Sequence, residues 1–113
     1  MKFAEVIPEL ARAIPEFKPD QTNAGDQITY LLLQDLIQFT FGLDPGTDGA
    51  LLHRIFDFLD RLCESSDQEV RMLSRDVAWT VAEDASLHRF KSFVGKHLRQ
   101  YIRDSPVGTA LLN

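Results

Sequence analysis

Cysteine is almost absent from this sequence. Cys63 is the single cysteine among 113 residues, so the chain cannot form an intramolecular disulfide or a thiol cluster with metal-ligand spacing. Long apolar runs are missing too: no segment approaches the ~20 apolar residues that span a bilayer, and acids and prolines interrupt the first 17 residues, where a signal peptide would need a continuous apolar core. We therefore expect a cytoplasmic protein that does not cross a membrane.

Residues typical of phosphate and metal sites are also scarce. Gly46 and Gly49 belong to a turn, and the lysine that follows in a phosphate-binding loop is missing. None of the three histidines is paired with a second ligand in a recognised zinc pattern, such as two histidines one helical turn apart: His53, His88 and His97. We expect no metal ion and no cofactor.

Groups for acid, base or nucleophilic catalysis have simpler explanations. Three carboxylates fall on neighbouring helical turns, but Arg54 and Arg61 are interleaved with them and are expected to form ion pairs at i,i+3 or i,i+4 spacing: Asp57, Asp60 and Glu64. Cys63 falls on an apolar stripe, and burial there would raise the pKa of its thiol and make it unreactive. We expect no enzymatic activity and no catalytic residues.

Apolar residues recur with helical spacing along most of the chain, and no segment shows the alternation of a half-buried strand. This pattern predicts an all-α fold, a compact bundle of five helices in one domain over residues 1–104, with a loosely held tail over 105–113. The second helix has apolar residues on both sides and is expected to be central. The expected helices span about 3–14, 27–43 after a cap by Asp26, 52–64, 68–81 after a cap by Asp67 or Ser66, and 87–102 after a cap by Ser86.

The stretch from Leu51 to Ala78 resembles a HEAT-type helical hairpin. One amphipathic helix turns through a loop that contains Asp67 into a second helix, which opens near Val70-Arg71. The chain is also similar to a group of small bacterial helical domains, some of which are immunity proteins encoded beside secreted toxins. One helical pair is too short for a repeat array, so the resemblance implies a compact bundle with one HEAT-like corner.

Basic residues are missing from a long stretch near the N-terminus. No lysine or arginine occurs between Lys18 and Arg54, whereas five aspartates do: Asp20, Asp26, Asp35, Asp44 and Asp48. Some of these fit as helix caps or turn formers, but the missing bases leave the stretch acidic. An acidic surface speeds encounter with a basic partner, over a screening length of ~8 Å at physiological salt.

The remainder of the chain has the opposite charge. Residues 1–69 hold 13 acids and 5 bases, net −8, and residues 70–113 hold 4 acids and 7 bases, net +3. Four of these bases would form one stripe along a continuous fifth helix: Arg89, Lys96, Arg99 and Arg103. The stripe would suit phosphates or acids of the same chain, but a pI near 5.0 and the lack of a nucleic-acid-binding motif disfavour nucleic acid as the partner.

Met72 and Trp79 are seven residues apart and share a helical stripe opposite Val70 and Val77. Trp79 is expected either to pack on the second helix or the tail, or to stand exposed beside Arg75 as an anchor for a partner. Tryptophan and arginine are the residue types that most often dominate the binding energy of protein interfaces.

These features and the resemblance favour one function, an immunity-type inhibitor that binds and neutralises a basic toxin domain, such as a nuclease, in the cytoplasm. The alternative is a small adaptor or regulatory subunit that uses the Met72 and Trp79 surface or the basic stripe. A third hypothesis is a nucleic-acid accessory protein. The candidate partner-binding residues are Asp20, Asp26, Asp35, Asp44, Asp48, Met72, Arg75 and Trp79.

Overall fold

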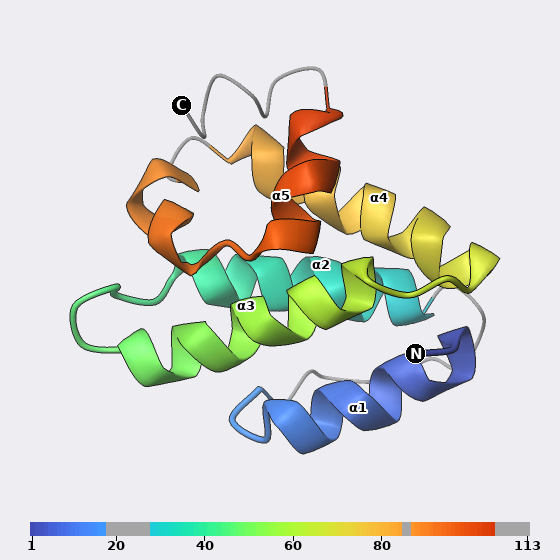
Figure 1. The fold of residues 1–113 in the computed structure, drawn as a ribbon. Coiled ribbons are helices and arrows are strands. Elements are labelled where there is room, and N and C mark those ends of the chain that lie inside the picture. The colour runs from blue at the N-terminus through green and yellow to red at the C-terminus, as the bar shows by residue number, and fades with distance from the viewer. Residues whose placement is uncertain (18–27, 85–86, 106–113) are drawn as a thin grey trace.

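The computed structural model describes residues 1–17, 28–84 and 87–105 (Figure 1). These residues form helices and no strand, which confirms the predicted all-α fold. There are five α-helices and two 3-10 segments in this part of the chain: η1 (Phe3–Glu5), α1 (Val6–Ala13), α2 (Ile28–Phe41), α3 (Gly49–Cys63), α4 (Gln68–Glu83), η2 (Leu87–Phe93) and α5 (Lys96–Arg103).

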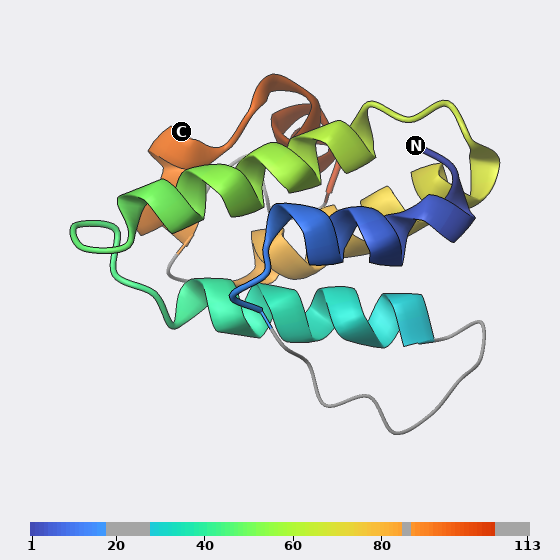
Figure 2. The same ribbon diagram turned by 90° about the horizontal axis from the view of Figure 1, so that it is seen from below.

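Helix α3 organises the bundle. It contacts α1 on one side and the pair α4 and α5 on the other, whereas α2 packs against α4 (Figures 1 and 2). Seven of its residues recur at helical spacing and are buried. Among them, Phe56 and Phe58 are, together with Phe90 of η2, the largest fully buried side chains. The core therefore lies around α3, and the other helices cover it.

Helix α4 begins at the cap expected from the sequence. Asp67 is its N-cap, and Oδ1 of this residue accepts hydrogen bonds from the backbone amides of Glu69 at 3.0 Å and Val70 at 3.2 Å. The consecutive helices α3 and α4 pack against each other, as the predicted hairpin requires. The HEAT-type character of this hairpin stays a prediction.

Helix α2 is covered by aromatic contacts on both sides, as its two apolar stripes predict. Phe39 packs against Phe17 of the N-terminal segment, with ring centroids 5.4 Å apart, and Phe41 meets the edge of Phe90 at 5.1 Å. The cover is incomplete, because the side chain of Leu31 remains 56% exposed. Helix α2 is therefore only partly enclosed, and the prediction that it is the central helix is wrong, because α3 has that position.

The predicted fifth helix is wrong in one respect: it is broken. The chain runs as the 3-10 segment η2 up to Phe93, and after Val94 and Gly95 it starts again as α5. At the break, the carboxylate of Asp60 from α3 caps the start of α5. Its Oδ1 accepts hydrogen bonds from the backbone amides of His97 at 2.8 Å and Leu98 at 2.9 Å. Apolar periodicity alone did not reveal this break, because both pieces bury their own apolar residues.

Several predictions fall on residues outside the described part of the chain. The caps by Asp26 and Ser86 belong to this group, as does the tail beyond Ser105. Ser105 itself is buried, and its hydroxyl donates to the carbonyl of Ile102 at 2.6 Å. None of the helices in the described ranges is long and apolar enough to cross a membrane.

Candidate protein-binding surfaces

The outer side of α2 carries the first candidate surface. Asp35 is exposed there, and it lies one turn after Leu31, the exposed leucine of this helix. Asp35 forms no ion pair with any described residue, and no lysine or arginine occurs from residue 28 to residue 53. Its charge is therefore available to a partner. The predicted sites at Asp20 and Asp26 lie outside the described residues.

Asp44 and Asp48 extend this acidic surface into the loop before α3, but they also build the loop. Oδ2 of Asp48 accepts a hydrogen bond from the amide of Asp44 at 2.9 Å, and Oδ1 of Asp44 accepts one from the amide of Gly46 at 2.9 Å. Asp44 is exposed and Asp48 is half-buried. Neither forms an ion pair within the described ranges, so both contribute negative charge in addition to their structural role.

The second candidate surface lies on α4. The side chain of Met72 is 58% exposed, and the guanidinium carbon of Arg75 lies 4.6 Å from the ring centroid of Trp79. Trp79 is half-buried and packs against the core. Trp79 is thus neither fully buried nor exposed: it packs against the core, and Arg75 lies over its ring.

A shallow hollow of about 220 Å³ lies beside this stack, between α4 and α5. We call it the α4–α5 hollow, and it is lined by Gln68, Arg71, Met72, Arg75 and Tyr101. Arg71 and Tyr101 are not among the binding residues predicted from the sequence. Arg71 has no distinguishing motif, and Tyr101 was expected only as an apolar-face residue of the fifth helix, so its position opposite α4 depends on how the two helices pack.

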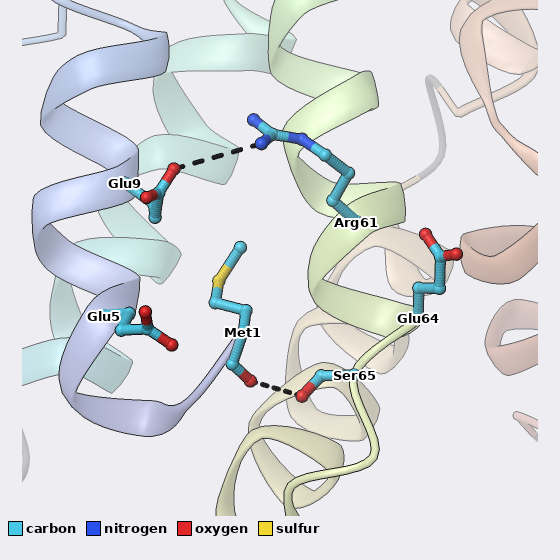
Figure 3. Close-up of a pocket in the computed structure, with 6 residues that line it drawn as sticks. All are labelled: Met1, Glu5, Glu9, Arg61, Glu64 and Ser65. Carbon is cyan, nitrogen blue, oxygen red and sulfur yellow. Dashed lines mark hydrogen bonds and ion pairs between the residues drawn. The ribbon is translucent and has the colours of Figure 1, made fainter.

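A second hollow, of about 380 Å³, separates α1 from the end of α3 (Figure 3). Most charged residues that line it form ion pairs or hydrogen bonds within the chain. Oε1 of Glu9 binds Arg12 at 2.5 Å, Oε2 of Glu9 lies 4.0 Å from Arg61, and Oε1 of Glu5 accepts from the amide of Lys2 at 2.7 Å. The hydroxyl of Ser65 donates to the carbonyl of Met1, which ties the first residues to the α3–α4 loop. The lining residues are Met1, Glu5, Glu9, Arg61, Glu64 and Ser65.

The two carboxylates of α3 and that of Glu64, which follows its last residue, do not converge on a common point. Asp57 lies 3.6 Å from Nε of Arg61, as predicted, whereas Asp60 caps α5, and Oε1 of Glu64 lies 4.0 Å from Nε2 of His97. The predicted pairing of Arg54 with these acids is wrong. Arg54 instead pairs across the bundle with Glu16, and this pair lowers the pKa of the Glu16 carboxyl. A hollow of about 420 Å³ beside Asp60 is lined by His53, Arg54, Phe56, Asp57, Asp60, Phe93 and Gly95.

The basic stripe is also divided, because the fifth helix is broken. Arg89 belongs to η2 and lies over the ring of Phe90, with its guanidinium carbon 5.6 Å from the ring centroid. Arg99 of α5 donates to the carbonyl of Lys91 at 3.4 Å. The four bases therefore do not form the single helical stripe that a continuous helix would give.

Cys63 lies in the core, as its position on the apolar stripe predicted. Burial raises the pKa of its thiol from 9.0 to about 12, although the hydrogen bond with Ser74 acts in the opposite direction. The thiol is therefore protonated at neutral pH. Within the described residues, no group of three or more histidine, cysteine, aspartate or glutamate side chains is placed to hold a metal ion.

Comparisons with models of protein families, with curated proteins and with solved structures found no match to this chain. The resemblance to HEAT-type hairpins and to immunity-type proteins therefore stays a prediction.

Proposed function

We propose that this protein acts by binding another protein, as an inhibitor of the immunity type that covers the basic surface of a toxin domain. One observation carries the proposal: Asp35 and Asp44 are exposed and form no ion pair among the described residues, in a stretch that has no lysine or arginine between residues 28 and 53. The toxin as partner comes from the family resemblance alone. The acidic surface supports a basic protein partner of any kind.

The acidic surface is suited to attraction over a distance. Carboxylates that are not neutralised by neighbouring bases produce a field that a basic partner meets before contact, and such a field raises association rates steeply at low salt. The loop around Asp44 is held by its own hydrogen bonds, so the charges of Asp44 and Asp48 keep fixed positions. A preordered surface loses little conformational entropy on binding.

An adaptor is the second candidate function. It is favoured by the α4–α5 hollow, where Met72 is exposed and Arg75 stacks on Trp79. Exposed methionine and a stacked arginine are typical of the centres of protein interfaces. An adaptor would use this surface without any requirement for a basic partner.

The first experiment is a capture of partners by the tagged protein, at low salt, from the cells that naturally produce it. The inhibitor proposal predicts stoichiometric recovery of one basic polypeptide whose own toxic or enzymatic activity is lost in the reconstituted complex. Recovery of nucleic acid, or of a partner that stays fully active when bound, would reject the inhibitor proposal. The second of these outcomes would favour the adaptor.

The role of the acidic surface is then tested on the reconstituted complex. Asp35→Lys reverses an exposed charge, and Asp44→Asn removes a charge while it keeps an oxygen that can accept from Gly46. Each change is expected to slow association about threefold to tenfold at low salt, with little effect at high salt. Glu83→Lys is the matched control, because Glu83 is an exposed acid on a different helix, where it is the last residue of α4. Equal effects of Glu83→Lys and Asp35→Lys would show that only the net charge matters.

A further inference from the structure

We propose that the α4–α5 hollow binds an acidic segment of a partner protein, and that this segment carries an apolar side chain next to its carboxylates. The proposal goes beyond the acidic surface discussed above, because it concerns a different part of the molecule and the opposite charge. It rests on two arginines, one exposed methionine and one tyrosine that line a single hollow.

Two positive charges point to a negatively charged ligand. Arg71 and Arg75 are both exposed, both line the hollow, and neither forms an ion pair within residues 1–17, 28–84 and 87–105. They are four residues apart on α4 and therefore lie on neighbouring turns, about 5–6 Å apart at their Cβ atoms. This spacing suits two carboxylates of one peptide segment.

The stack of Arg75 on Trp79 prepares one of these arginines for binding. With its guanidinium carbon 4.6 Å from the ring centroid, the planar group lies over the indole, which restricts its orientation before a ligand arrives. Stacking uses the face of a guanidinium and leaves its N–H edges free to donate two parallel hydrogen bonds to a carboxylate. The arginine therefore loses less side-chain entropy on binding than a freely rotating one would.

The apolar part of the ligand is indicated by Met72. Met72 is 58% exposed and lines the hollow together with the two arginines, and Tyr101 of α5 lies across the hollow, partly buried. Methionine adapts its shape to apolar partners and is common at binding surfaces. The volume of about 220 Å³ is below the ~300 Å³ at which pockets for drug-sized ligands begin, so the hollow suits a side chain of a protein better than a small-molecule cofactor.

A protein segment fits these observations better than a nucleic acid does. Single-stranded nucleic acids bind by stacking their bases on open aromatic faces, but Arg75 already lies over the ring of Trp79. The net charge of the whole chain is −5, which opposes binding of a polyanion that extends beyond the hollow.

The chain has a built-in reporter for this hollow, because Trp79 is its only tryptophan. The probes are synthetic peptides of about twelve residues, each with four glutamates or aspartates around one leucine or phenylalanine, and matched peptides in which glutamine or asparagine replaces the acids. We expect the acidic peptides to change the emission of Trp79 in a saturable manner and to shift the amide NMR signals of residues 68–75 and 101. We expect this binding to weaken as salt is raised.

Variants separate the proposed site from general electrostatic attraction. Arg71→Gln and Arg75→Gln are each expected to weaken peptide binding about tenfold, measured by calorimetry or NMR so that the altered surroundings of Trp79 do not interfere. Lys91→Gln removes the same charge from an exposed position on η2 and is expected to leave binding unchanged. Arg75→Lys, which keeps the charge but loses the planar fork, is expected to lie between Arg75→Gln and the parent.

Four results would overturn the proposal: no acidic peptide binds, the neutral peptides bind equally well, Lys91→Gln weakens binding as much as Arg75→Gln does, or a single-stranded oligonucleotide binds the hollow more tightly than every peptide. Concentration-dependent sedimentation of the protein alone tests whether a second copy occupies this surface, and dimerisation that Arg75→Gln abolishes would also overturn it. These experiments leave the acidic surface intact. Results that reject peptide binding at the α4–α5 hollow would therefore not reject the proposed inhibitor function.

Discussion

Gly95 lies directly against Asp60, where α3 meets the start of α5. A Cβ atom at residue 95 would fall 2.5 Å from both Cγ and Oδ1 of Asp60, far inside van der Waals contact. The backbone of Gly95, with φ −81° and ψ 176°, is open to any residue, so the glycine is needed for close approach and not for its conformational freedom. The side chain of Asp60 replaces the missing cap of α5, whose own N-cap residue has no side chain to offer.

We expect Gly95→Ala to destabilise the protein by about 1–3 kcal/mol, measured as a fall in the free energy of unfolding in urea. The carboxylate of Asp60 is held by two backbone amides, so it cannot move away from a new methyl group without loss of these hydrogen bonds. Gly49→Ala is the matched control, because no atom lies within 4 Å of a Cβ built there.

We expect Asp60→Ala to cost about 1–2 kcal/mol by loss of the cap, and to make Gly95→Ala nearly harmless when the two are combined. The alanine at residue 60 removes the atoms that obstruct a Cβ at residue 95, so the two effects should not add. A double-mutant cycle of urea unfolding measures this coupling. Strictly additive effects would show that Asp60 is not the obstacle.

The break before α5 illustrates what the sequence could and could not predict. Helical periodicity predicted the all-α class and most of each helix, because apolar residues at this spacing must face a core. It also predicted one continuous fifth helix, since the apolar residues Leu87, Phe90, Leu98 and Ile102 fit one period. All four are indeed buried. The break depends on Asp60, which is 35 residues before Gly95 in the sequence, and no local pattern reports such a distant cap.

The candidate surfaces were predictable to the extent that they lie on one element. Met72, Arg75 and Trp79 were selected from the wheel of a single helix, and the structure places them on the same side of α4. Tyr101 was not selected, because its approach to α4 depends on packing between helices. A structural role for some of the aspartates was predicted, but not which of them hold the loop before α3, since a turn-forming aspartate and a free acidic one look alike in the sequence.

Cys63 should resist thiol reagents as long as the protein is folded. With the pKa raised from 9.0 to about 12, the thiolate is about a thousandfold scarcer at pH 8 than for an exposed cysteine, and the core blocks access as well. Labelling with a disulfide reagent at pH 8 should therefore be slow and should accelerate sharply in urea. Rapid labelling of the native protein would contradict the buried position.

The same thiol makes stability fall in alkali. The pKa of the thiol is higher in the folded than in the unfolded chain. The contribution of the protonated thiol to the free energy of unfolding is therefore complete below about pH 9 and is lost as the pH rises towards about 12. Cys63→Ala removes the titrating group. The difference in the free energy of unfolding between parent and variant should therefore shift against the parent between pH 9 and pH 11.

The pair between Glu16 and Arg54 should add a pH dependence at the acidic end. Its hydrogen bond lowers the pKa of the Glu16 carboxyl in the folded chain, so its stabilisation is present above the unfolded pKa near 4.5 and is lost as pH falls through the lower folded value. Glu16→Gln should thus be less stable than the parent at pH 7, and the difference between their melting temperatures should shrink as the pH falls below 4.5. Glu83→Gln, at an exposed acid of α4, should show no such convergence, and a Glu16→Gln difference that does not shrink with falling pH would contradict the role of the ion pair.

Substitutions in the acidic surface can separate effects on stability from effects on partner binding. Asp48→Ala removes the oxygen that accepts from the amide of Asp44, and we expect it to cost about 1 kcal/mol in urea unfolding. Asp35→Ala removes an exposed charge with no described partner, and we expect a change within about 0.5 kcal/mol. If Asp48→Ala unfolds like the parent, the hydrogen bond to Asp44 does not hold the loop. If the expected difference is found, a loss of partner binding in Asp48 variants reflects loop structure as well as charge, whereas the same loss in Asp35 variants reports charge alone.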